Sequence, residues 1–152
     1  MLKKIALLTT LAMALLLATA NLSYAQAPKD RVEGFWMNQE KEAKVEIYKA
    51  KNGKFYGKIV WLKEPNRDGK PKTDTNNPKE NLRSQPLIGL LILKAFEKDG
   101  EKMYEGGTIY DPKNGKTYSC KITYESNNTL SIRGYIGISM LGRTTTWTRS
   151  TP

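Results

Sequence analysis

The sequence predicts an all-β protein, an eight-stranded antiparallel up-and-down barrel with one long loop at about residues 64–86. Much of the chain alternates apolar and polar residues with a period of two, as half-buried strands do. Short turns rich in Asn, Gly and Pro separate these stretches, and no long amphipathic helix interrupts them. Eight strands can close into a barrel that is filled by side chains or holds one small ligand. A two-sheet sandwich is the alternative.

The first 25 residues are predicted to be a secretory signal peptide and not part of the fold. A basic start precedes an apolar run at residues 5–17, and small residues lead to a cleavage position after Ala25. We expect a single domain at 26–152, located in the periplasm or secreted. The apolar run is shorter than the about 20 residues that cross a bilayer, and an uncleaved anchor is the alternative.

The charge balance is strongly basic. Lys and Arg number 25 against 15 Asp and Glu, which makes the formal net charge +10. Removal of Lys3 and Lys4 with the signal lowers it to +8, because residues 1–25 contain no acidic residue. Such a balance permits anionic partners such as envelope components, but lysines scattered among acidic residues are typical of a solvated surface. Export argues against nucleic acid, and we expect no transmembrane segment after signal cleavage.

The first three strands are expected at residues 32–38, 43–48 and 54–63. Asn52-Gly53 between the last two predicts a hairpin, because a type I′ turn needs positive φ at both central positions. One parity of the third strand is expected to face the interior: Phe55, Gly57, Ile59 and Trp61.

Residues 64–86 break the strand pattern, because they are rich in Pro, Asn, Asp, Lys and Gly and poor in apolar residues. Long connections of this kind often form lids or binding loops, and a flexible surface loop is the alternative. A short helix at about 79–83 fits the sequence, since Asn77 can cap it with Pro78 in the first turn. Arg83 is a candidate for reaching over the barrel mouth.

The remaining strands are expected at residues 87–96, 103–110, 117–124, 130–135 and 144–149. The first of these is apolar enough to be buried on both faces, with a short helix as the alternative. Residues 111–115, with a proline second and a glycine last, suit a type I turn followed by a left-handed residue. Residues 136–141 form an apolar turn, which a soluble protein rarely exposes without a use.

Two resemblances follow from these motifs. Gly34-x-Trp36 on the first strand, with Arg149 on the last, resembles the lipocalin signature, in which the arginine packs over the tryptophan at the closed end. This resemblance implies that the residues closing the barrel are Gly34, Trp36, Trp147 and Arg149.

The fuller resemblance is to an exported bacterial family, domain of unknown function 2147. Its pattern spans essentially the whole mature chain, through Gly34-Phe35-Trp36, Asp74-Thr75-Asn76-Asn77-Pro78, Arg83-x-x-Pro86-Leu87-Ile88-Gly89-Leu90, Gly107-x-Ile109-Tyr110-Asp111-Pro112 and Arg133-Gly134-Tyr135 on to Trp147-x-Arg149. It implies a lipocalin-like barrel with no assigned reaction. The chain departs from typical lipocalins in leaving no room for a helix after the last strand. It departs from fatty-acid-binding proteins in lacking two helices after the first.

The composition argues against catalysis. Histidine is absent, which removes Ser-His-Asp and Cys-His catalysis and His-ligated zinc. The single cysteine, Cys120, cannot build a thiolate metal site. Asp74 and Asp111 are the remaining candidates for a carboxylate pair, although Asp111 suits a turn. We therefore expect no enzyme activity, no metal and no cofactor.

We predict that the barrel binds a small apolar or amphipathic ligand, with an anionic head group as one option. Aromatic residues with polar tips commonly line such cavities, although they can also simply fill a small barrel. The candidate ligand-binding residues are Trp61, Arg83, Tyr104, Tyr118, Tyr124, Arg133, Tyr135 and Met140. The alternative function is a non-catalytic envelope interaction module that acts through its basic surface or its 64–86 loop. We expect a monomer.

Overall fold

The computed structural model describes residues 29–152, so the predicted signal peptide at 1–25 lies outside the described part. The barrel strands are β1 (Gly34–Met37), β2 (Ala43–Lys49), β3 (Phe55–Leu62), β6 (Leu91–Asp99), β7 (Met103–Asp111), β8 (Lys116–Ser126), β9 (Thr129–Tyr135) and β10 (Arg143–Ser150). The remaining elements are the hairpin strands β4 (Asn66–Arg67) and β5 (Lys70–Pro71) and the 3-10 turns η1 (Glu80–Leu82) and η2 (Ser139–Leu141). Among these residues no helix is long and apolar enough to span a bilayer.

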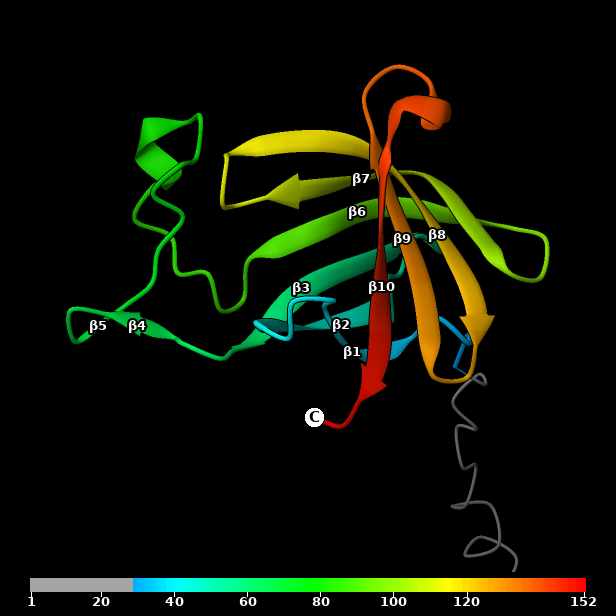
Figure 1. Cartoon of the computed structure of the whole chain (residues 1–152), viewed down its shortest axis with the longest axis horizontal. Helices are drawn as coiled ribbons and strands as arrows, with labels where there is room; N and C mark the ends of the chain where they lie inside the picture. The colour runs from blue at the N-terminus through cyan, green and yellow to red at the C-terminus, as the bar shows by residue number, and fades with distance from the viewer. Residues whose placement is uncertain (1–28) are drawn as a thin grey trace, which may run out of the picture.

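The eight barrel strands pair antiparallel in the closed order β1-β10-β9-β8-β7-β6-β3-β2 (Figure 1). The first and last strands meet through Phe35 opposite Ser150, Trp36 opposite Arg149 and Met37 opposite Thr148. This confirms the predicted eight-stranded up-and-down barrel and excludes the sandwich. β4 and β5 form a separate hairpin in the long connection from β3 to β6, outside the barrel.

The alternation of strand direction divides the connections between two ends of the barrel. Residues 38–42, 63–90, 112–115 and 136–142 lie at one end, which we call the open end. The turns at 50–54, 100–102 and 127–128 lie at the other end, the closed end, together with residues 29–33.

The side chains that fill the barrel belong mostly to its closed half. The fully buried members there include Trp36, Phe55, Phe96, Tyr104 and Leu130. Phe55 and Tyr104 pack edge to face, with ring centroids 5.1 Å apart. Cys120 is also buried, and burial raises the pKa of its thiol to about 12. It therefore stays a protonated, inert part of the core.

The prediction that Trp61 shares the inner face of its strand is wrong. Val45 pairs with Ile59 but Lys44 pairs with Trp61, so β3 carries one extra residue at this point. Such a bulge reverses the inward and outward alternation. Trp61 consequently lies on the outer surface with 38% of its area exposed, and the Lys44 ammonium lies 5.6 Å from its ring.

Three other details differ from expectation. The segment expected as a strand from 87 begins only at Leu91, and the alternative of a short helix there is wrong. The helix expected at 79–83 is only the 3-10 turn η1, which begins after Lys79 and not at an Asn77 cap. The hairpin at 50–54 forms, but among its residues only Gly53 has positive φ, so it is not a type I′ turn.

Candidate functional site

A cavity of about 1550 Å³ occupies the open half of the barrel. Its apolar wall comes from six inward-facing strand residues: Val45, Ile59, Ile92, Ile109, Ile132 and Trp147. None of the large aromatic residues that fill the closed half lines it. The volume exceeds the roughly 300–1,000 Å³ of typical small-molecule sites, because it includes the space beneath the 63–90 connection.

Three tyrosines line the cavity, and two of them, Tyr110 and Tyr118, have hydrogen-bonded hydroxyl groups. The Tyr110 hydroxyl donates to Asp74 Oδ1 over 2.8 Å. Burial, followed by that bond to Asp74, raises the pKa of Tyr110 to about 12. Tyr118 accepts a hydrogen bond from Asn114 Nδ2 over 3.0 Å. At neutral pH the Tyr110 phenol is therefore protonated and donates its proton to Asp74, so this ring offers aromatic surface and not acid–base chemistry.

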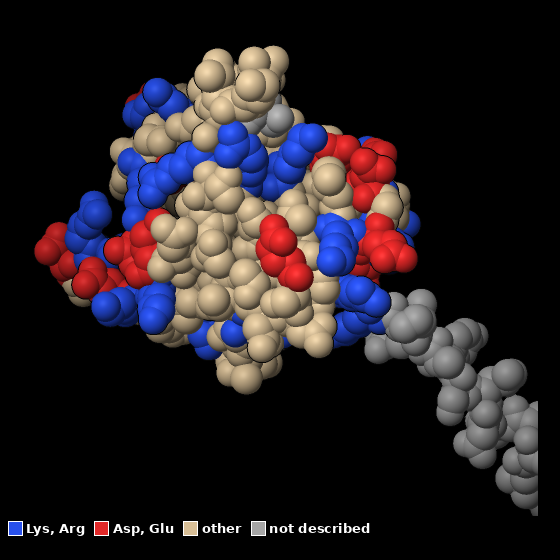
Figure 2. Space-filling model, turned by 45° about the vertical axis from the view of Figure 1, so that its right-hand side comes forward, with Lys and Arg blue, Asp and Glu red and all other residues tan. Residues whose placement is uncertain are grey.

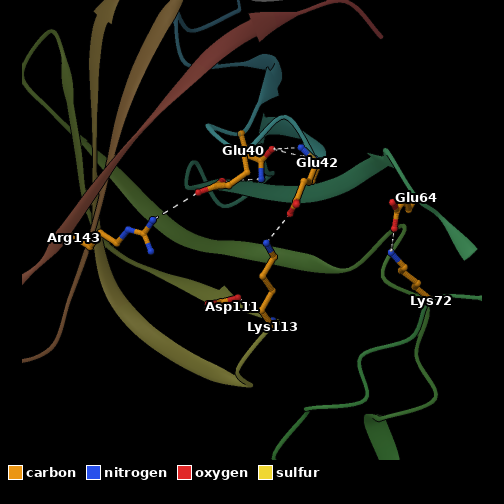
Figure 3. Close-up of polar contacts among 9 residues, drawn as sticks. Glu40, Glu42, Glu64, Lys72, Asp111, Lys113 and Arg143 are labelled. Carbon is orange, nitrogen blue, oxygen red and sulfur yellow. Dashed lines mark hydrogen bonds and ion pairs between the residues drawn. The ribbon is translucent and has the colours of Figure 1, made fainter. Parts of the chain in front are cut away.

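Ion pairs surround the mouth of the cavity (Figure 3). Lys113 Nζ lies 2.6 Å from Glu42, Lys72 Nζ lies 3.3 Å from Glu64, and Arg143 lies 3.8 Å from Glu40. The hydrogen bond between Lys113 and Glu42 raises the pKa of Lys113 and lowers the pKa of Glu42. Six basic and five acidic residues line the cavity in total: Lys63, Arg67, Lys70, Lys72, Lys113 and Arg143, with Glu40, Glu42, Glu64, Asp68 and Asp111. The rim is thus nearly neutral, and its charge alone does not select an anion.

A buried carboxylate holds the long loop onto the barrel. Asp74 is fully buried; its Oδ2 accepts from Asn77 Nδ2 over 2.7 Å, and its Oδ1 accepts from Tyr110. The Asp74 backbone amide donates to the Gln85 carbonyl, and Thr73 bridges to Pro86. Both oxygens are therefore satisfied, as a buried carboxylate requires. The loop is closed at its base and anchored through Tyr110 to β7.

The same loop also docks on the turn between β7 and β8. The Asn76 side-chain amide donates to the carbonyls of Pro112 and Lys113, each over 3.0 Å. Gly115 has φ +71, and a Cβ there would lie only 1.9 Å from the Asn76 carbonyl oxygen. Only glycine fits both the positive φ and the close approach of the Asn76 backbone. The Asp74-Thr75-Asn76-Asn77-Pro78 motif is therefore a latch that positions one side of the cavity mouth.

The predicted ligand-binding residues occupy different places. Tyr118 and Tyr135 line the cavity. The other six do not line it: Trp61, Arg83, Tyr104, Tyr124, Arg133 and Met140. Arg83 donates through Nε to the Asn77 carbonyl over 2.9 Å, within the loop. Arg133 donates to Thr144 Oγ1 and to the Met140 carbonyl over 2.7 and 3.1 Å.

Tyr104 and Tyr124 belong to the closed end. Tyr104 donates its hydroxyl to Asp30, and Tyr124 donates to Asn127 Oδ1 over 2.5 Å. Lys98 also contacts the Asp30 carboxylate, at 2.7 Å. These phenols tie the barrel floor to residues outside it and do not face the cavity.

The residues predicted to close the barrel lie at two levels. The Arg149 guanidinium lies 3.9 Å from the centroid of the Trp36 ring and donates to the carbonyls of three residues: Arg31, Glu33 and Asn127. A Cβ on Gly34 would lie 2.9 Å from Arg149 Nη1. Trp147 faces inward higher in the barrel and lines the cavity.

Several wall and rim residues were missed from the sequence: Ile109, Ile132, Glu42 and Lys113. Strand parity could have found Ile132, which alternates with outward residues, whereas a bulge between Tyr104 and Gly107 reverses the parity of β7 before Ile109. Parity does not report depth along the barrel, however, and depth separates cavity wall from core. Among residues 29–152 no group of three or more His, Cys, Asp or Glu could hold a metal ion.

Comparison with known proteins agrees with this geometry. Residues 34–149 match the family described as uncharacterized protein conserved in bacteria, DUF2147. The chain belongs to this family. The DUF2147 chain is also similar to a solved structure, protein HP1028 from the human pathogen Helicobacter pylori, which is described as belonging to the lipocalin family. The two share 32% sequence identity with a TM-score of 0.69, over 78% of this chain and 82% of the other. No curated protein matches the chain.

Proposed function

We propose that this DUF2147 protein binds one small apolar or amphipathic molecule inside its barrel. The observation that carries the proposal is the cavity of about 1550 Å³, which has an apolar wall and one open end. The lipocalin-like fold is compatible with this role, because eight-stranded barrels can enclose a single small ligand. Burial of the ligand against the wall would supply the affinity.

The cavity would orient an amphipathic ligand. Its apolar part would pack against Ile109, Ile132 and Trp147, and its polar end would lie at the ion-paired rim. An anionic head group would compete with Glu42 for Lys113 or with Glu40 for Arg143. A neutral polar head would leave both pairs intact. The proposal therefore includes both kinds of head group, and binding measurements distinguish them.

The proposed role is non-catalytic. Both oxygens of Asp74 accept hydrogen bonds from Asn77 and Tyr110, which suits a structural latch. Asp111 Oδ1 accepts from the Lys113 backbone amide over 2.9 Å, which suits a turn former. The sequence contains no histidine that could replace them as a general base at neutral pH.

Tryptophan quenching provides a local test. Trp147 lines the cavity, whereas Trp36 lies under Arg149 and Trp61 lies on the outer surface. A dibrominated fatty acid quenches indole rings that it contacts. In the Trp61→Phe variant, titration with this probe should quench fluorescence with saturation. The signal should disappear when Trp147 is also changed to Phe. Repeating the titration in competition with a fatty alcohol of the same length reports the head-group preference.

A cavity-filling variant provides the matched control. A Cβ at Gly134 meets only ordinary contacts, 3.5 Å from Ile109 and 3.7 Å from Tyr118, so Gly134→Leu places its side chain in the cavity. We expect at least a ten-fold loss of probe affinity. Thr148→Leu, which adds a similar apolar group at an exposed site on β10, should bind normally. Equal binding by Gly134→Leu, or no quenching of Trp147 by any probe, would overturn the proposal.

We further propose that the protein is exported and works as a monomer. The basic start and apolar run at residues 1–25 support export. Expression in a bacterium followed by intact mass measurement should find a mature chain that begins at Gln26. Light scattering of that chain should give the mass of one copy. A mass that includes residues 1–25 would contradict cleavage of the signal peptide.

A further inference from the structure

The connection between β9 and β10 exposes a concentrated apolar surface at the cavity mouth. Ile136, Ile138, Met140 and Leu141 are 69%, 61%, 83% and 79% exposed. We call residues 136–141 the apolar tip; it projects at the top of Figure 1. Ile136 and Leu141 also line the cavity mouth. Four large apolar side chains exposed within six residues are unusual for a soluble protein and indicate an interaction site.

The apolar tip has a defined backbone conformation. Gly137 has φ +73, and the Leu141 amide donates to the Ile138 carbonyl over 3.2 Å within η2. A Cβ on Gly142 would lie 2.6 Å from the Gly134 carbonyl oxygen, so this close approach at the base of the tip requires glycine. Arg133 donates to the Met140 carbonyl. The fold therefore presents these side chains to solvent in a preformed arrangement.

Basic residues lie at the base of the apolar tip. Arg143 begins β10 with only Gly142 between it and the tip, and its side chain is 80% exposed. Arg133 pairs across with Thr144 on the same two strands. Figure 2 shows an uncharged projection at the top of the molecule with Lys and Arg side chains directly beneath it. An apolar end above a cationic base matches the layers of an anionic membrane surface, where acyl chains lie beneath charged head groups.

We propose that the apolar tip inserts into the surface of an anionic phospholipid bilayer, with Arg133 and Arg143 at the level of the lipid phosphates. The net charge of +8 for residues 26–152 favours this occupant. A second protein copy fits less well, because four side chains on a convex projection fall short of the roughly 800 Å² per partner of a stable interface.

This orientation would turn the cavity mouth toward the bilayer, because Ile136 and Leu141 belong to both the tip and the mouth. An apolar molecule could then move between membrane and barrel without crossing water. That exchange rests on the proposed ligand-binding function, whereas the membrane contact does not.

Vesicle co-sedimentation tests the proposal with the exported protein. We expect binding to vesicles of phosphatidylglycerol and phosphatidylethanolamine, and at least ten-fold weaker binding to pure phosphatidylcholine. The double variant Ile138→Ser with Met140→Ser should bind the anionic vesicles at least ten-fold more weakly. Neither residue lines the cavity. The matched control is Ile88→Ser with Met103→Ser, which removes two exposed apolar residues from β7 and the connection to β6 and should bind normally.

A second pair of variants tests the contribution of Arg143 to vesicle binding. Arg143→Gln should weaken binding to anionic vesicles several-fold at low salt. At 0.5 M salt most of that difference should disappear, because the screening length is then between about 3 and 10 Å and the attraction between exposed charges is weak. Lys51→Gln, in the exposed turn at the closed end, should change little.

Other outcomes would overturn the proposal. Equal vesicle binding by the double variant and the parent protein would exclude the apolar tip as the contact. A concentration-dependent dimer that disappears in the double variant, without vesicle binding, would make the tip an interface between copies. Quenching of Trp147 by the brominated fatty acid should survive in the double variant, so failure of membrane binding and failure of ligand binding are separate results.

Discussion

The closed and open ends of the barrel are built from the same eight strands but are organised in opposite ways. At the closed end Trp36, Phe55, Phe96 and Tyr104 fill the interior, and residues 29–33 lie across it. At the open end the inward residues line a cavity and none fills it. The packed core and the cavity therefore occupy separate halves of one barrel.

The polar groups of the two ends differ in the same way. Arg149 stacks on Trp36 and donates to three backbone carbonyls, so removing it would leave several acceptors without a partner. The rim pair Lys113 and Glu42 retains side-chain exposures of 69% and 52%. Exposed pairs of this kind contribute little to stability. Substitutions at the two ends should therefore have very different effects on unfolding.

The largest effect is expected at the centre of the closed end. Trp36→Ala should lower the free energy of unfolding by about 3–5 kcal/mol, because it removes a fully buried ring and leaves a void. Urea denaturation followed by circular dichroism measures this change. Trp61→Ala, at a site that is 38% exposed on the outer surface, should cost clearly less. Similar losses for the two variants would contradict the contrast between core and surface.

A smaller effect is expected at the latch, which joins the long loop to the barrel. Asp74→Asn should lower the unfolding free energy by about 1–3 kcal/mol, because an amide cannot accept from both Asn77 and Tyr110. Hydrogen exchange should rise in residues 73–86 more than in the strands. Asp111→Asn, at the half-buried end of β7, keeps an acceptor oxygen for the Lys113 backbone amide; it is the control and should leave exchange in this loop unchanged.

The closed end should also show a pH-dependent contribution from Asp30. Burial raises the pKa of Asp30, but hydrogen bonds from Lys98 and Tyr104 outweigh it and hold the pKa below the ordinary value of 3.8. The carboxylate therefore contributes its full stabilisation above pH 3.8, the pKa of the unfolded state. This contribution disappears as pH falls through the lower pKa of the folded state. Asp30→Asn should be less stable than the parent protein at pH 7, and thermal unfolding should show the gap closing below pH 3.8.

The smallest effect is expected at the rim. Glu42→Gln breaks the ion pair with Lys113, yet it should leave the unfolding midpoint unchanged within error. Its effect should appear in ligand binding, because Lys113 becomes available to an anionic head group. Affinity for the brominated fatty acid, which carries a carboxylate, should therefore rise. A large loss of stability would show that the rim contributes to the fold as the closed end does.

Much of the fold could be predicted from local patterns. The alternation in residues 43–48 and the turn residues at 111–115 specify strands and their connections, and the structure contains both. Trp61 shows the limit of this reasoning. A single bulge opposite Lys44 reverses the alternation, and no residue in the sequence announces it. Side-chain direction therefore follows from pairing with the neighbouring strand as well as from parity.

The candidate site was harder to predict, because aromatic side chains look alike in the sequence whether they fill a barrel or line a cavity. Tyr118 and Tyr135 line the cavity, whereas Tyr104 and Tyr124 lie in the floor. Depth along the barrel separates them, and depth depends on strand register and tilt. The Asp74 motif was visible as a family pattern, but its role as a latch appears only through contacts with Tyr110 and Gln85.

The sequence by itself determined the fold class, the order of the barrel strands and the apolar character of residues 136–141, because periodicity, turn chemistry and hydropathy are local properties. Only the tertiary structure decided that the barrel is packed at one end and hollow at the other, and that the apolar tip stands beside the mouth of the hollow. The physical reason is that each depends on contacts between residues far apart in the chain. Gly134 and Ile109 meet only when their strands assemble into the barrel, and Asn76 and Gly115 meet only when the long loop docks on the turn between β7 and β8.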